Sequence, residues 1–319
     1  MRKTLTGFLS AVLAVGLGTF SLKAEPLAYP HKVVTLVTHS SPGGGSDVFL
    51  RELSKYLGKY IGATFIVENV QGGSGAKAVA RVAAAPADGS VFYATTPTYI
   101  YTSLLSKPSA TYKDLEPLVN LFADSEVIYT RADGPFKTLQ DVIDKAKKER
   151  GRWGAANPAS LERQAAEQLK RAAGVNAAIV THEGGGDMML NVLNGTLDIG
   201  IGEIQELRSQ IDAGKIRLLA TFNPARIPEK PDVPTVKESG FDVTLVKFRG
   251  LAGPKGLPDN VTKVWDEAIK NVLADPEYKA RYTEEVLVPN YIPHAQYQAF
   301  ITNFADTTEA FLKETGAVK

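Results

Sequence analysis

The sequence predicts an α/β protein of two lobes, each a sheet with helices on its faces. Strand-like and helix-like segments alternate almost throughout, and this order builds parallel sheets covered by helices. The alternation starts again after about residue 125. The chain has 319 residues, more than one hydrophobic core usually serves, so two cores are expected.

The first 24 residues have the layout of a secretory signal peptide. Residues 1–3 form a basic start, residues 5–20 are mostly apolar, and Ala24 is a small residue at a suitable cleavage point. The alternative is an uncleaved membrane anchor, but the apolar stretch is shorter than the ~20 residues that a membrane span needs. We therefore expect a cleaved leader over residues 1–24 and export to the periplasm.

The first unit of the remaining chain is a β-α-β-α-β series. A β-branched run at residues 33–38 leads through a glycine-rich loop into a helix, whose apolar positions recur at helical spacing from Phe49 to Tyr60. Further strands are predicted at residues 64–68 and 91–95, with a helix over residues 75–84 between them.

The second unit begins with the strand-like residues 126–130. Thr138 and Ser160 are placed to cap helices, and Gly174 ends the second of these helices. The other predicted strands lie at residues 153–156, 177–181, 197–201 and 216–221, and the helices at residues 138–149, 161–173, 188–193 and 204–211.

A proline-rich connection over residues 224–235 leads into a mostly helical C-terminal part, with helices at residues 260–274, 276–284 and 294–314. We expect the chain to cross between the lobes near residues 120–125 and 220–225. Lobe 1 would then comprise residues 25–122 and 223–319, and lobe 2 residues 123–222.

The composition excludes several functional classes. The chain has no cysteine, which rules out disulfides, thiolate metal sites and a cysteine nucleophile. Its 36 Lys and Arg balance 35 Asp and Glu, and 33 basic residues remain against 35 acidic ones without the leader, so the excess of cations that nucleic-acid binding needs is missing. The four histidines lack metal-binding spacing and no Gly-x-Ser-x-Gly motif occurs, so we predict no metal, no cofactor and no catalytic residue.

Four loops of small residues lead into predicted helices and could hold an anion. The longest is Ser40-Ser41-Pro42-Gly43-Gly44-Gly45-Ser46-Asp47, and the others lie at residues 71–75, 157–160 and 183–187. Glycine lets backbone amides turn towards a ligand, and a helix start adds free N–H donors with partial positive charge. The alternative for any single loop is a tight turn with a helix cap such as Ser46. Because the loops follow strands in both units, we expect them on opposite walls of one cleft.

Three charged side chains are further candidates. Arg249 would clamp a carboxylate if it faces the cleft, although a lone arginine is usually a surface ion pair. Glu183 and Glu203 lie where strands lead into helices, and could be the carboxylates of an exported hydrolase or isomerase. The alternative for both glutamates is a polar cleft wall or a helix cap.

An ordered series of motifs resembles a known receptor family. It includes Pro42-Gly43-Gly44-Gly45-Ser46-Asp47, Ala87-Asp88-Gly89, Glu183-Gly184-Gly185-Gly186-Asp187, Asn194-Gly195-Thr196-Leu197-Asp198, Pro231-Asp232-Val233-Pro234-Thr235 and Arg249-Gly250. The motifs extend over nearly the whole chain after the leader. Together they resemble the substrate-binding proteins of tripartite tricarboxylate transporters, the Bug-type periplasmic receptors.

The resemblance implies a type II periplasmic-binding-protein architecture, with two Rossmann-like lobes that close on a small ligand and no enzymatic activity. It implies a small organic acid as ligand and the membrane permease subunits of such a transporter as partners. We expect a monomer that binds no nucleic acid. A sensor subunit that presents its ligand to a signalling protein, and the exported enzyme above, are the alternatives.

The resemblance also implies contact residues. In lobe 1 they are His39, Ser40, Ser41, Gly44, Gly45, Ser46, Asp47, Gly73, Thr95, Thr96, Pro97 and Thr98, and in lobe 2 Asn157, Ser160, Gly184, Gly185 and Glu203. Arg163, where the family often has histidine, and Arg249 complete the predicted site. Because extra cationic groups suit a second carboxylate, we favour a dicarboxylate, with aromatic acids of the phthalate type included.

Overall fold

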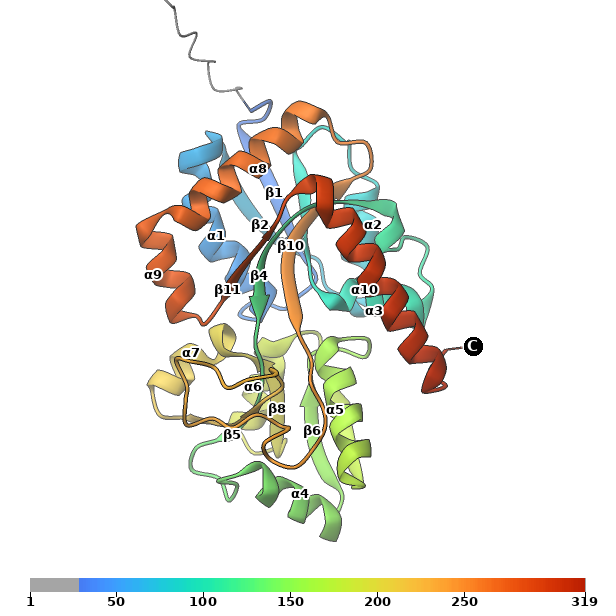
Figure 1. Cartoon of the computed structure of the whole chain (residues 1–319), viewed down its shortest axis with the longest axis vertical. Helices are drawn as coiled ribbons and strands as arrows, with labels where there is room; N and C mark the ends of the chain where they lie inside the picture. The colour runs from blue at the N-terminus through green and yellow to red at the C-terminus, as the bar shows by residue number, and fades with distance from the viewer. Residues whose placement is uncertain (1–28, 319) are drawn as a thin grey trace, which may run out of the picture.

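The two predicted sheets are present, one in each lobe (Figure 1). The computed structural model describes residues 29–318, so the predicted signal peptide lies outside the described residues. Among the helices of this described part, none is both long and apolar enough to cross a membrane.

Lobe 1 contains a six-stranded mixed sheet. In spatial order its strands are β11 (Val288–Ile292), β4 (Leu115–Asp124), β10 (Lys247–Pro254), β3 (Val91–Thr95), β1 (Val33–Thr38) and β2 (Thr64–Asn69). The predicted parallel pairing holds for β1 with β2 and β3, whereas β10 runs antiparallel to β3 and β4. The sequence did not predict β4 and β11, because prolines and polar residues interrupt their apolar pattern.

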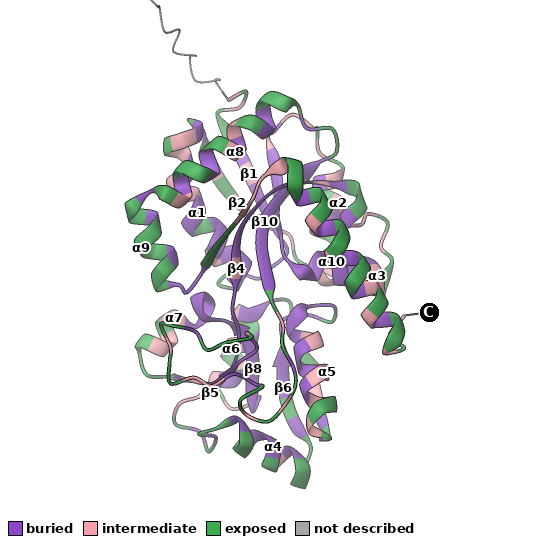
Figure 2. Cartoon of the chain, in the orientation of Figure 1, coloured by how far each residue is buried: buried purple, intermediate pink, exposed green. Residues whose placement is uncertain are grey.

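Helices cover both faces of this sheet. One face carries α1 (Gly45–Ile61), α8 (Asp259–Ala274) and α9 (Pro276–Glu284), and the other carries α2 (Ala76–Ala83), α3 (Pro97–Ser106) and α10 (His294–Glu314). Figure 2 shows that β4 and β10 are buried, whereas the outer faces of the helices are exposed. On the α1 face, Trp265 is fully buried and packs its ring against Phe65 and Phe92 at centroid distances of 5.8 and 4.7 Å.

Lobe 2 contains a five-stranded sheet. In spatial order its strands are β7 (Ala177–Thr181), β6 (Gly151–Ala155), β8 (Ile199–Glu203), β5 (Glu126–Arg131) and β9 (Ile216–Thr221). As in lobe 1, the three strands of the repeating unit, β6 with β7 and β8, are parallel, while β5 is antiparallel to its neighbours. The helices α4 (Leu139–Lys148) and α5 (Leu161–Ala173) pack in one core, and α6 (Gly185–Leu193) and α7 (Ile204–Asp212) in the other.

The chain crosses between the lobes twice. It leaves lobe 1 where β4 leads through Ser125 directly into β5, close to the predicted point. After β9 the expected return near residue 222 does not occur there, because Val236 and Val243 pack into the core of lobe 2. The proline-rich connection has no periodic pattern that would indicate which core its apolar residues join. We therefore propose that lobe 2 extends to about residue 246.

The two crossing strands bring charged residues to the junction of the lobes. β10 pairs with β4 in lobe 1, and the register places Lys247 opposite Asp124 at the ends of these strands. Glu126 begins β5 directly after the junction. The side chains at the junction of the lobes are therefore acidic and basic.

We predict that Trp265→Ala lowers the free energy of unfolding by about 3–5 kcal/mol, because it removes the largest side chain of the core beneath α8. Trp265→Phe is the matched control, since it keeps an aromatic ring and loses the Nε1–H hydrogen bond of 2.9 Å to the Tyr29 hydroxyl. Urea unfolding followed by circular dichroism should show the smaller loss for phenylalanine. Equal losses would contradict ring packing as the main contribution.

Candidate functional site

A small cavity lies between the lobes, beside the carboxyl ends of strands from both sheets. Its volume is about 20 Å³, room for about one water molecule. Lobe 1 lines it with His39, Ser40, Gly45, Ser46, Thr96 and Thr98, lobe 2 with Ala156, Asn157, Glu162, Glu183, Gly184, Gly185, Glu203 and Glu206, and β10 with Lys247. The place is the one that the loop positions predict.

Many of the predicted contact residues meet at this cavity. They are His39, Ser40, Gly45, Ser46, Thr96, Thr98, Asn157, Gly184, Gly185 and Glu203. They come from loops that follow β1, β3, β6, β7 and β8. The structure therefore brings together loops from both units that are far apart in the sequence, since 59 residues separate Thr98 from Asn157 and 164 separate His39 from Glu203.

Other predicted residues of lobe 1 do not line the cavity. Gly44 precedes α1, Pro97 begins α3, and Gly73 lies in a 3-10 turn at φ 62°, which favours glycine. Ser41 is buried with its hydroxyl unpaired among the described residues.

Asp47 and Thr95 are engaged in hydrogen bonds inside lobe 1. The Asp47 carboxylate accepts from the Gly43 amide at 2.9 Å and from Arg51 Nε at 2.9 Å. The Thr95 hydroxyl shares a 2.7 Å hydrogen bond with the Tyr297 hydroxyl. These two side chains fix the loop and strand ends around the cavity rather than lining it.

Ser160 and Arg163 belong to the start of α5. The Ser160 hydroxyl accepts the Arg163 amide at 3.0 Å and caps the helix. The Arg163 guanidinium donates to Glu167 at 2.7 Å and lines a separate groove beside the end of α10. In this arrangement neither residue reaches the cavity.

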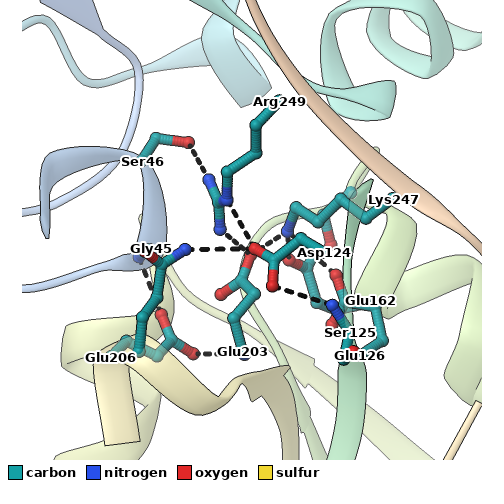
Figure 3. Close-up of polar contacts among 12 residues, drawn as sticks. Gly45, Ser46, Asp124, Ser125, Glu126, Glu162, Glu203, Glu206, Lys247 and Arg249 are labelled. Carbon is teal, nitrogen blue, oxygen red and sulfur yellow. Dashed lines mark hydrogen bonds and ion pairs between the residues drawn. The ribbon is translucent and has the colours of Figure 1, made fainter. Parts of the chain in front are cut away.

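Lys247 is the centre of a buried ionic network (Figure 3). Its Nζ donates to Glu126 Oε1 at 2.9 Å, to Glu162 Oε1 at 2.8 Å and to Glu203. Burial disfavours the ammonium form, but the facing carboxylates Glu126 and Glu162 raise the pKa of Lys247 above its usual value. The three glutamates offer oxygens within 4.8 Å of one another, a spacing that could hold a metal ion, and Nζ lies in that place here.

Arg249 follows on the same face of β10 and is fully buried. Its Nε donates to Asp124 Oδ2, its Nη2 lies 3.1 Å from Glu203 Oε1, and its Nη1 donates to the Ser46 hydroxyl at 3.3 Å. The sequence suggested that this guanidinium clamps a ligand carboxylate. In the structure it is paired with the protein's own carboxylates and lies behind the cavity.

The start of α1 already holds a carboxyl group. The Gly45 amide of lobe 1 donates to Glu206 Oε2 of lobe 2 at 2.9 Å (Figure 3). This is the position in which the glycine-rich loop was predicted to hold an anion. Glu206 therefore joins the lobes and occupies the anion position with a group of the protein itself.

Burial shifts the ionisation of several groups around the cavity. It raises the pKa of Glu126 to about 8 and, with the nearby Glu162, that of Glu206 to about 8. For Glu162 burial acts in the same direction, but the Lys247 ammonium outweighs it and lowers the pKa. Near neutral pH, Glu126 and Glu206 are therefore largely protonated.

His39 does not supply a positive charge to the cavity. Burial, with the Lys247 ammonium as the next cause, lowers its pKa to about 4. Its Nδ1 shares a 2.7 Å hydrogen bond with the Tyr93 hydroxyl. Near neutral pH this ring is a neutral hydrogen-bonding group.

Sequence reasoning missed most of the ionic network. Asp124, Glu126, Glu162, Glu206 and Lys247 were not predicted as site residues. Weak signals were present, since Glu162 follows Ser160 in the first turn of a helix and Lys247 stands two residues before Arg249. Such positions are common for helix-capping acids and surface lysines, so these signals did not indicate a site.

The chain matches the family described as the tripartite tricarboxylate transporter family receptor over residues 49–317. A curated relative, the UPF0065 protein in the gbd 5' region of Cupriavidus necator, is 27% identical over 318 residues, which cover 98% of this chain and 96% of the relative.

Solved structures share the fold. The periplasmic binding protein BugD has a TM-score of 0.84 at 24% identity, covering 91% of this chain and 100% of that one. R. palustris Rpa4515, solved with adipate, has a TM-score of 0.84 at 23% identity, covering 90% of this chain and 98% of that one. These similarities establish the two-lobed periplasmic-binding-protein architecture.

We predict that Lys247→Met lowers the free energy of unfolding by about 3–5 kcal/mol at pH 7, because buried carboxylates lose their cation. Guanidinium unfolding gives the value. The control is Lys263→Met, whose side chain is 70% exposed and whose ammonium is 3.7 Å from Asp259, so it should cost no more than about 1 kcal/mol. Similar small losses in both variants would show that the network is not structurally important.

We predict a pH-dependent difference between the wild type and Glu206→Gln. A carboxyl group whose pKa is raised in the folded state binds more protons folded than unfolded, so stability falls as pH rises from about 4.5 to about 8. Glutamine removes this proton linkage. Between pH 5 and pH 8 the wild type should therefore lose stability relative to the variant, about tenfold or more in the unfolding equilibrium constant. If the stabilities of the wild type and the variant changed with pH in parallel, the raised pKa of Glu206 would be contradicted.

Proposed function

Because the chain belongs to the tripartite tricarboxylate transporter receptor family, we propose that it captures a small organic acid between its lobes and delivers it to a membrane permease. The predicted leader and the periplasmic family members support a periplasmic location. The adipate-bound relative supports an organic acid as ligand.

One observation carries the proposal for this chain, the hydrogen bond between the Gly45 amide and Glu206. The amide stands at the start of a 17-residue helix, where backbone N–H groups and partial positive charge favour a carboxylate. The group it holds belongs to the opposite lobe. A ligand carboxylate that replaces Glu206 at this amide would join the lobes in the same way.

Entry of a solute requires the lobes to separate. The cavity has room for about one water molecule and is lined from both lobes. β4 and β10 are the strands that lead from lobe 1 to the junction, so bending beyond them would open the cleft (Figure 1). A ligand that contacts both walls only in the closed state shifts the population towards closure.

The exported-enzyme alternative is less well supported. It would use Glu203 or Glu183 as a base. Lys247 and Arg249 both engage the Glu203 carboxylate, so this group is not free to accept a proton from a ligand. Glu183, which lines the cavity, would be the remaining base of such an enzyme, whereas a receptor needs none.

We predict that organic acids raise the Tm and bind with measurable heat. A thermal-shift and calorimetry screen would compare mono-, di- and tricarboxylates, with and without amino groups, with sugars and simple amines. X-ray scattering should show a smaller radius of gyration for the protein with a bound acid than for the protein without it, because the acid closes the molecules that are open. Binding of a sugar with no response to any acid would overturn the proposal.

We predict that Gly184→Ala weakens acid binding about tenfold or more. A Cβ at Gly184 would lie 2.4 Å from the Ser41 hydroxyl and 2.6 Å from the Ser41 amide of the opposite lobe, so the lobes could not close fully. The control is Leu190→Ala on the exposed face of α6, with a side chain 60% exposed. Calorimetry measures the affinities, and circular dichroism checks that both variants fold. Unchanged affinity in Gly184→Ala would contradict closure at this contact.

A further inference from the structure

The wall of the cavity that lobe 2 contributes is acidic. Glu162, Glu183, Glu203 and Glu206 all line it. Lys247 is the charged residue that faces them from β10, and its ammonium is already shared among glutamates. The second wall therefore presents more negative than positive charge to any solute.

The buried network behind this wall is also unbalanced. Asp124, Glu126, Glu162, Glu203 and Glu206 face Lys247 and Arg249, and all seven side chains are buried. Burial favours the neutral form of Glu126 and Glu206. Asp124, Glu162 and Glu203 are the other carboxyl groups around the two cations, so a group that enters here meets acidic side chains rather than free cations.

Two polar atoms at the cavity lack partners among the described residues. They are Glu162 Oε2 from lobe 2 and the Thr96 hydroxyl from lobe 1. Glu162 is 4% exposed and Thr96 1% exposed, so solvent does not satisfy them. Buried polar groups are nearly always hydrogen-bonded, so these two atoms are open to a hydrogen-bond donor from a ligand. When ionised, the Glu162 carboxylate only accepts hydrogen bonds, and the Thr96 hydroxyl can accept one as well.

We propose that the solute carries a protonated amine as well as a carboxylate, and that its ammonium group binds between Glu162 and Thr96. The inference rests on the proposed function, in which the carboxylate takes the Gly45 amide. The ammonium places a positive charge against the acidic wall and donates to both unpartnered oxygens. The network already holds an ammonium of the same kind on Glu162, that of Lys247.

This proposal replaces the dicarboxylate that the sequence favoured. That expectation relied on Arg163 and Arg249 as extra cations. Arg163 lies in a separate groove, and Arg249 donates through Nε to Asp124, so neither residue lines the cavity. A second carboxylate without an amine would instead face the glutamates of lobe 2. A divalent metal ion is disfavoured because Lys247 holds the place among Glu126, Glu162 and Glu203.

The test compares acids that differ only in the amine. Calorimetry on the purified full chain would pair glutamate with glutarate, aspartate with succinate, and 4-aminobutyrate with butyrate. We expect at least one amine-bearing acid to bind about tenfold or more tightly than its partner without the amine. Equal or tighter binding of the amine-free acid in every pair would overturn the inference.

Glu162→Gln should reduce the preference for the amine about tenfold, measured as the ratio of the two affinities within a pair. Glutamine keeps the shape and removes the charge that attracts the ammonium. The matched control is Glu167→Gln, which lies outside the cavity on the same helix and pairs with Arg163. Thr96→Val provides a second variant in case Glu162→Gln fails to fold, and it should also lower the ratio. An unchanged ratio in folded variants would overturn the inference.

The outcomes separate this inference from the proposed function. Binding of amine-free acids alone overturns the inference and leaves the receptor function supported. Binding of simple amines such as cadaverine, without any acid, supports the acidic site and overturns the carboxylate part of the proposed function. Binding of neither class overturns both.

Discussion

The Lys247 ammonium, shared by three glutamates, is the contact on which the arrangement of the two lobes depends. Lys247 begins β10, the strand by which the chain returns to lobe 1. Its partners begin β5, begin α5 and end β8, so one cation joins three elements of lobe 2 to that strand. Away from water such contacts are strong, and the loss of one partner leaves a costly buried charge. The cation therefore favours one relative position of the lobes.

The same network determines which contacts within the protein a solute has to replace. In the closed arrangement, the protein's own groups occupy the places that a ligand would use, with Glu206 on the Gly45 amide and Lys247 among the glutamates. Under the proposed function, binding is an exchange, in which contacts to the solute replace contacts within the protein. Only the difference between the two sets of contacts shifts the population towards closure. Selectivity for charge follows from this exchange, because a solute with the wrong charge leaves the buried network less balanced than before.

The sequence predicted part of the site because glycine-rich loops at strand ends have a local signature. The loop with Gly45 and the loop with Gly184 were located in this way, and both line the cavity. The ionic network was missed because its members look ordinary one at a time. Glu206 stands three residues after Glu203, as an acid in a helix cap does, and it does hydrogen-bond to the Glu203 amide at 3.3 Å. Its second contact, across the cleft, has no sequence signal.

The sequence by itself determined the alternation of strands and helices, the two-lobed architecture and the family. These follow from periodicity and turn residues, which act between near neighbours and so are visible along the chain. Only the tertiary structure places Val236 and Val243 in the core of lobe 2, Arg163 away from the cavity, and acidic side chains along the cleft. Lys247 meets partners that are 121, 85 and 44 residues away in the sequence. Both the pairing and the ionisation of such groups depend on burial, and burial exists only once the lobes have folded and met.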